Sequence, residues 1–115
     1  MQHPSVFRPG DHAVWSAATM GKATLFESPR LLLGLNAFEP GQSHALHAHA
    51  GMDKVYYVIA GSGRFLLDGQ ALPMTAGDML VAPEGVPHGI ENTSGERLLV
   101  MAVLAPGPRA AGKQA

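Results

Sequence analysis

Three histidines stand in two short, glycine-punctuated segments of the chain, and imidazole is the side chain that most often binds transition metals in proteins. His47 and His49 form a His-x-His pair in the first segment, and His88 lies in the second. Residues two apart on a β-strand point to the same face of the sheet. If the pair lies on one strand and His88 begins a neighbouring one, the three side chains can hold a metal ion between them.

The rest of the chain predicts a β scaffold for these histidines. Its 14 glycines and 9 prolines are spread along all 115 residues and leave short apolar pieces, a pattern typical of an all-β sandwich or barrel. Asp68-Gly69 predicts a two-residue hairpin with a type I′ turn, which needs positive φ at both central residues. The expected strands are 22–27, 31–38, 45–49, 55–59, 63–67, 70–74, 79–81, 89–92 and 98–104.

The chain divides into an arm, a barrel and a tail. Residues 1–20 are expected to form an N-terminal arm with at most one short helical turn over 13–20, residues 21–105 the barrel, and residues 106–115 a flexible tail. The apolar runs 31–33 and 98–104 do not alternate with polar residues, so both faces of these strands should be buried. In a barrel of this size a second subunit would cover one outer face, and we expect a homodimer.

Charge and composition exclude several classes of protein. Lys and Arg total 8 against 9 Asp and Glu, so there is no basic field for nucleic acid and no basic stretch for a membrane surface. No apolar run approaches the roughly 20 residues of a membrane span, and the N-terminus lacks a secretory pattern, which predicts a cytoplasmic protein. The chain has no cysteine, so any metal must be bound by histidine, carboxylate and water.

The two histidine segments resemble the two motifs of the cupin superfamily, in particular its small single-domain bacterial members. The first family motif reads Gly, five residues, His-x-His, three or four residues, Glu, six residues and Gly. The second reads Gly, five residues, Pro-x-Gly, two residues, His, three residues and Asn. The matching residues are Gly41, His47, His49 and Gly61 in the first motif and Gly77, Pro83, Gly85, His88 and Asn92 in the second.

The resemblance implies a fold and a cofactor. The fold would be an antiparallel jelly-roll barrel, or double-stranded β-helix, which limits exposed sheet edges. The cofactor would be a divalent transition metal, Fe, Mn, Ni, Zn or Cu, bound inside the barrel by His47, His49 and His88.

The chain departs from the family at Lys54, which stands where the first motif has Glu, with Asp53 directly before it. A protonated lysine about 5 Å from a metal would be repelled by roughly 3 kcal/mol per unit of metal charge at an effective dielectric constant near 20. Lys54 can turn to solvent, pair with Asp53 or another carboxylate, or stay in the barrel as a neutral base, and the site can also be metal-free. We expect a three-histidine site with Lys54 turned aside. Asp53 is an alternative ligand, although its strand parity is opposite to the Glu position.

Strand parity also places the neighbouring side chains. His44 is three residues from His47, so it should face the opposite side of the strand and be exposed to solvent rather than bind the metal. Tyr56 shares the parity of Lys54 and either lines the pocket or packs in the core, where its hydroxyl needs a partner. The expected core also contains Phe38, Phe65, Met79 and Met101, whereas His3 and His12 in the arm are expected at the surface.

Two functions fit this pattern. A three-histidine centre with open positions suits a metal-dependent enzyme, such as a dioxygenase or isomerase acting on a small organic molecule. The missing Glu fits instead a non-catalytic module that binds or senses a small ligand or the metal. The fold does not choose between them, and neither the substrate nor the metal can be named from the residues.

Overall fold

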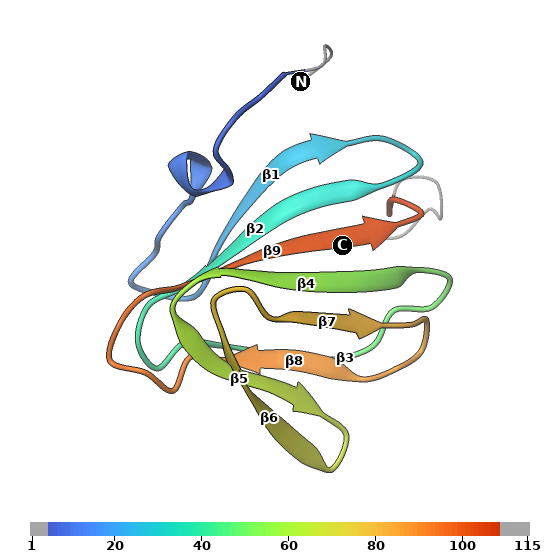
Figure 1. The fold of residues 1–115 in the computed structure, drawn as a ribbon. Coiled ribbons are helices and arrows are strands. Elements are labelled where there is room, and N and C mark those ends of the chain that lie inside the picture. The colour runs from blue at the N-terminus through green and yellow to red at the C-terminus, as the bar shows by residue number, and fades with distance from the viewer. Residues whose placement is uncertain (1–4, 109–115) are drawn as a thin grey trace.

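Two antiparallel β-sheets pack against each other in the computed structural model, which describes residues 5–108, and they form the expected jelly-roll barrel (Figure 1). One sheet has the strand order β1-β2-β9-β4-β7 and the other has the order β3-β8-β5-β6. One turn of 3-10 helix, η1 (Pro9–His12), precedes the sheets. The strands are β1 (Gly21–Glu27), β2 (Leu32–Phe38), β3 (Ser43–His47), β4 (Asp53–Ala60), β5 (Ser62–Leu67), β6 (Gln70–Thr75), β7 (Met79–Ala82), β8 (His88–Glu91) and β9 (Leu98–Ala105).

Each expected strand is present, and the differences lie at strand ends and turns. β3 pairs with β8 alone, and its last pair is His47 with His88, so His49 lies in the loop that follows the strand. The short turn expected over 13–20 is not helical, and the helical turn forms earlier, where Pro9 presets φ for the first position of η1. The hairpin at Asp68-Gly69 joins β5 to β6, but a type I′ turn is excluded: Gly69 has φ 81°, and no non-glycine residue in the described chain has positive φ.

The apolar core lies between the sheets and stops short of the histidines. It consists of Phe38, Tyr56, Val58, Phe65, Met74, Ile90, Leu98, Val100 and Ala102, so Phe38 and Phe65 are core residues as expected. On the inner face of β9, the small residue Ala102 pairs with Gly34 of β2. Because these two small residues leave the inner faces of β2 and β9 unfilled, a cavity opens beside the core, and both residues line it.

The N-terminal arm covers part of the outer face of the five-stranded sheet. Phe7 and Trp15 of the arm pack against a second apolar cluster that contains Leu35 of β2 and Leu99 of β9. Met101, expected in the core, is half-buried at the edge of this cluster. The outward side of β9 is therefore buried in part by the chain itself, which explains why the strand carries apolar residues on both faces.

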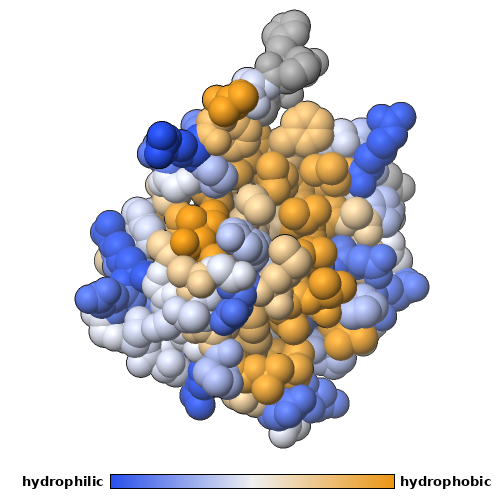
Figure 2. Space-filling view, viewed as in Figure 1, coloured by the Kyte–Doolittle hydropathy of each residue, from blue (hydrophilic) through white to orange (hydrophobic). Residues whose placement is uncertain are grey.

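An apolar area stays uncovered at the β7 edge of this sheet. The expectation that Met79 lies in the core is wrong, because its side chain is 60% exposed, and Val81 on the same strand is 58% exposed. β7 is an edge strand, so its outward side chains have a neighbour on one side only, Tyr57 and Val55 of β4. Figure 2 shows apolar side chains gathered over the strands of the five-stranded sheet in the orientation of Figure 1.

The two ends of the described chain lie outside the barrel. His12 in η1 is exposed, as expected, whereas His3 lies outside the described residues. After β9, the backbone N–H of Gly107 donates a hydrogen bond to the carbonyl of Pro29 at 3.2 Å. Residues 109–115 lie outside the described residues, so the flexible tail stays a prediction. No helix within residues 5–108 has the length and hydropathy needed to cross a membrane.

Gly61 joins β4 to β5 where the chain passes close to another backbone segment. It has φ +89°, and a Cβ there would lie 2.3 Å from the carbonyl oxygen of Arg97, whereas Gly69 has φ +81° with open space around it. Gly69→Ala should therefore lower the free energy of unfolding by about 1–2 kcal/mol, because only the strained backbone conformation opposes alanine there. Gly61→Ala should lower the free energy of unfolding by clearly more, because the strand entry at Arg97 must also shift. Urea unfolding of both variants measures this, and equal losses would contradict the close approach.

Candidate metal centre

The fold brings His47, His49 and His88 together. His47 ends β3 and pairs with His88, which begins β8. His49 comes from the loop after β3, where its carbonyl oxygen accepts a hydrogen bond from the backbone N–H of Gly85 at 2.8 Å. One ring nitrogen from each histidine lies within 4.8 Å of the other two. The three residues expected to share a site do so, although His49 reaches the site from a loop instead of from the strand face.

Backbone carbonyls orient two of these rings. Nδ1 of His47 lies 2.7 Å from the carbonyl oxygen of Ala45, and Nδ1 of His88 lies 2.9 Å from that of Val86. A carbonyl only accepts a hydrogen bond, so each Nδ1 donates and each Nε2 keeps its lone pair. The Nε2 atoms of all three histidines are buried without a hydrogen-bond partner in the described residues. Two imidazoles oriented in this way, together with the buried Nε2 of His49, fit a divalent transition metal.

Burial favours the neutral form of these imidazoles. Burial, followed by the charge of Lys54, lowers the pKa of His49 to about 4. Burial also lowers the pKa of His47 and of His88, and the hydrogen bonds to backbone carbonyls oppose part of this effect. A metal binds the neutral imidazole, so the rings are held in the form that a metal ion requires at neutral pH.

His44 also faces the cavity, and the expectation that it points to solvent is wrong. Its ring stacks on that of His47 with centroids 4.1 Å apart, and its Nδ1 is buried without a partner in the described residues. Strand parity fails here because β3 contains a bulge: His44 pairs with Ile90 and His47 with His88, so one extra residue lies on the β3 side. Opposite the bulge, a Cβ on Gly89 would lie 2.6 Å from the His44 carbonyl oxygen, so only glycine lets the strands approach this closely.

Lys54 is not turned aside. It alternates along β4 with the outward Asp53 and Val55, its side chain is 5% exposed, and it lines the cavity. Its Nζ lies 4.8 Å from the centroid of the Tyr56 ring, a cation–π contact. Strand pairing decides this orientation, because Lys54 lies between Ala82 and Leu104 on the inner face.

The Lys54 ammonium has no counter-charge within the described chain. Burial, followed by the charge of Lys22, lowers its pKa to about 8, so most Lys54 side chains remain protonated at pH 7. Neither Asp53 nor another carboxylate of residues 5–108 forms an ion pair with it. Of the outcomes considered from the sequence, the structure excludes rotation to solvent and pairing with a carboxylate.

Asp53 takes a structural part and does not reach the histidines. Its Oδ1 accepts a hydrogen bond from the backbone N–H of Glu84 at 2.9 Å, and the Glu84 carboxylate accepts one from the backbone N–H of Gly51. These bonds tie the β3–β4 loop to the β7–β8 loop. Because His49 lies in the first loop and His88 follows the second, the tie sets the distance between two of the three imidazoles.

Tyr56 lies inside the barrel, next to the site. It is fully buried, its ring centroid is 5.7 Å from that of His88, and burial raises the pKa of its hydroxyl. The hydroxyl has no hydrogen-bond partner in the described residues. Tyr56 therefore packs in the core and also presents an unpaired polar group behind the histidines.

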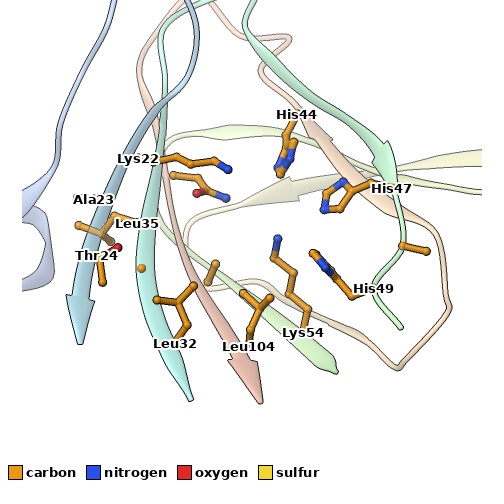
Figure 3. Close-up of a pocket in the computed structure, with 14 residues that line it drawn as sticks. Lys22, Ala23, Thr24, Leu32, Leu35, His44, His47, His49, Lys54 and Leu104 are labelled. Carbon is orange, nitrogen blue, oxygen red and sulfur yellow. The ribbon is translucent and has the colours of Figure 1, made fainter. Parts of the chain in front are cut away.

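A cavity of about 450 Å³ opens beside the centre; His44, His47 and His49 line it, whereas His88 does not. Figure 3 shows Lys22 and Lys54 entering it from the five-stranded sheet, while His44, His47 and His49 enter from the other side. Lys22 of β1 and Asn36 of β2 were not singled out from the sequence, because only the register that pairs them shows that they share the inner face. None of the described residues that line the cavity is Asp or Glu.

Known proteins match this chain along most of its length. A family model described as "Cupin domain" matches residues 34–104, which include both histidine segments. An oxalate-binding protein of Thermotoga maritima is 34% identical over 100 residues, which are 87% of this chain and 82% of the relative.

Solved structures show the same fold. A protein from Thermus thermophilus is 34% identical, with a TM-score of 0.83 over 88% of this chain and 96% of that one. An uncharacterized conserved protein with a double-stranded beta-helix domain from Klebsiella pneumoniae is 24% identical, with a TM-score of 0.85 over 91% and 92% of the two chains. The second likeness is one of fold alone.

Acid should destabilise the metal-free protein through the buried histidines. In the folded chain the pKa of His49 is about 4 and that of His44 is about 3, whereas an unfolded histidine titrates near 6.5. Between these values the unfolded state binds more protons, so the free energy of unfolding must fall as the pH drops below about 6.5. Urea unfolding of chelator-treated protein across this range should show the loss.

A pair of variants isolates the source of this pH dependence. His49→Gln should reduce the loss of stability in acid, while His12→Gln, which changes an exposed histidine of the arm, should leave it as in the wild type. A His49→Gln variant that is as acid-sensitive as the wild type would show that the cavity histidines are not responsible.

Proposed function

This chain belongs to the cupin domain family, and we propose that it binds a divalent transition metal through His47, His49 and His88. One ring nitrogen from each histidine lies within 4.8 Å of the other two, and the three Nε2 atoms are buried without a hydrogen-bond partner in the described residues; this convergence carries the proposal. Fe, Mn, Ni, Zn and Cu all accept imidazole ligands, so the donor set admits several of them.

Each residue of the centre has a defined task in this proposal. The carbonyls of Ala45 and Val86 fix the rings of His47 and His88 with Nε2 directed inward. His49 is positioned through its backbone bond to Gly85. When bound, the metal would supply Lewis-acid or redox chemistry at the positions that three histidines leave open.

The cavity beside the centre accommodates a small organic molecule, and we propose a dioxygenase or isomerase acting on such a molecule. A cavity of about 450 Å³ has the size of a small-molecule site, and the Thermotoga relative is an oxalate-binding protein. Lys54 faces the cavity, and burial lowers its pKa to about 8, so it can hold or release a proton near neutral pH.

A second candidate is a binding or sensing module without turnover. The observation that favours it is the absence of any carboxylate among the described residues that line the cavity, because acid–base chemistry commonly uses Asp or Glu. The name of the Thermotoga relative also describes binding. Consumption of oxygen or conversion of a small organic acid by the metal-loaded protein would decide for the enzyme.

A cytoplasmic location stays a prediction from the sequence.

The chain is further proposed to form a homodimer through the outer face of the five-stranded sheet. Met79 and Val81 at its edge are strongly exposed, and beside them Val55, Tyr57 and Val103 continue the same apolar face while half-buried. A second copy that covers this face would remove an apolar area that a monomer would leave in water.

Elemental analysis of untagged protein tests the metal centre. Wild-type protein should carry about one transition-metal ion per chain after purification without chelators, and His47→Ala and His88→Ala should each lose at least about tenfold in metal affinity, because each removes a ligand. His12→Ala, which removes a histidine outside the cavity, should bind like the wild type. Metal-free wild-type protein that also fails to take up added Zn²⁺ would overturn the proposal.

Light scattering after gel filtration tests the dimer. The wild type should have the mass of two chains at micromolar concentration, and Val81→Asp should shift it to one chain, because a carboxylate would be buried in the interface. Leu72→Asp, on β6 of the other sheet, changes an apolar side chain that is 39% exposed and should leave the dimer intact. A monomeric wild type would refute the proposed dimer.

A further inference from the structure

Two lysine side chains line the cavity, and no carboxylate of residues 5–108 neutralises their positive charge. Lys54 is buried and Lys22 reaches in from the mouth of the cavity, where it is exposed. Neither lysine forms an ion pair with a carboxylate of residues 5–108. Cupin motifs have a Glu where this chain has Lys54, so a bound metal would add to the positive charge instead of meeting a negative ligand.

The register of the five-stranded sheet aims these groups at one volume. Lys22 of β1 pairs with Asn36 of β2, and Lys54 of β4 lies further along the same inner face. Figure 3 shows the two ammonium groups directed across the cavity toward His44, His47 and His49. A molecule in the cavity would therefore meet cationic and amide donors on one side and the metal centre on the other.

A buried ammonium without a partner is unfavourable unless an anion accompanies it. Among residues 5–108, the printed contact of the Lys54 ammonium is with the face of the Tyr56 ring, which is electron-rich but carries no full charge. A carboxylate accepts hydrogen bonds from an ammonium and also ligates transition metals. A molecule with two carboxylates can do both at once, with a separate group for the lysines and for the metal.

We propose that the cavity binds a small dicarboxylate dianion and that this anion and the metal bind cooperatively. One carboxylate contacts the metal held by the three histidines, and the other lies between Lys22, Lys54 and the amide of Asn36. The first contact rests on the proposed metal centre, and the second does not. The dicarboxylate thereby supplies the negative charge that Glu supplies in the family motif.

Titration of the metal-free protein with malonate tests the lysine contact by calorimetry. Wild-type protein should bind malonate, and Lys54→Gln, Lys54→Met and Lys22→Gln should each weaken binding by about tenfold or more, since each removes a charge-assisted hydrogen bond. Two variants of Lys54 are used so that a folding defect in one, seen by circular dichroism, does not decide the result. Arg8→Gln, which removes an exposed cation of the arm, should bind malonate like the wild type.

Related anions test the class of ligand. Malonamide, the neutral analogue, should not bind, and acetate should bind more weakly than malonate. Unchanged malonate affinity in the Lys54 variants, or acetate or inorganic phosphate binding as tightly as malonate, would overturn the proposal.

Zn²⁺ affinity at buffered free metal, with and without malonate, tests the cooperativity. Malonate should tighten Zn²⁺ binding to the wild type by about tenfold or more, and Zn²⁺ should tighten malonate binding by the same factor. Lys54→Glu should bind Zn²⁺ more tightly than the wild type without malonate and gain nothing from it.

The outcomes separate the two proposals. Equal Zn²⁺ affinity of the wild type with and without malonate would overturn the cooperativity while leaving the metal centre intact. Failure of Zn²⁺ to bind under either condition would overturn the metal centre and the cooperativity with it, and the malonate titration of metal-free protein would still decide the lysine contact.

Discussion

The pairing of His47 with His88 across β3 and β8 is the contact on which the site depends. It places the imidazole at the end of β3 beside the imidazole at the start of β8, with ring centroids 4.3 Å apart. The carbonyls that orient the rings belong to Ala45 of β3 and to Val86, which lies two residues before β8. Gly89 permits the close approach of the bulged β3, and the bond from Gly85 to the His49 carbonyl adds the third imidazole. The centre is thus built mainly by backbone hydrogen bonds, which hold the rings with little freedom to lose on metal binding.

Charge is the second constraint on this centre. Three neutral imidazoles leave a divalent ion with its full charge, and Lys54, buried on β4, adds to it. The barrel tolerates the lysine because its stem packs on the inner face, where its ammonium meets the Tyr56 ring. A centre of this kind favours anionic ligands over neutral ones. In the complex proposed above, the bound anion supplies the negative charge that the Glu of the family motif would supply.

The sequence predicted the fold because its short apolar pieces and turn residues report strand positions directly, as with the hairpin at Asp68-Gly69. It also predicted that His47, His49 and His88 lie together, since their spacing matches a family motif; their role as metal ligands stays a proposal. The prediction that His44 faces solvent was wrong because strand parity assumes a regular strand. The bulge in β3 depends on the close approach of this strand to Gly89 of β8, which the sequence does not reveal. The prediction that Lys54 turns aside was wrong. Its strand parity was compatible with the barrel interior, but its charge favoured solvent, and the orientation of the side chain is decided by the packing of β4 between its neighbours. Lys22 was missed because its place on the inner face follows from pairing across four strands, which no local pattern records.

Anomalous scattering at the zinc edge, measured on crystals of the Zn²⁺-loaded protein, locates the metal and tests the three-histidine centre. We expect one peak about 2.0–2.1 Å from the Nε2 atoms of His47, His49 and His88, with the Lys54 ammonium outside the coordination sphere. A peak elsewhere, coordination through Nδ1, or Lys54 Nζ as a ligand would contradict it.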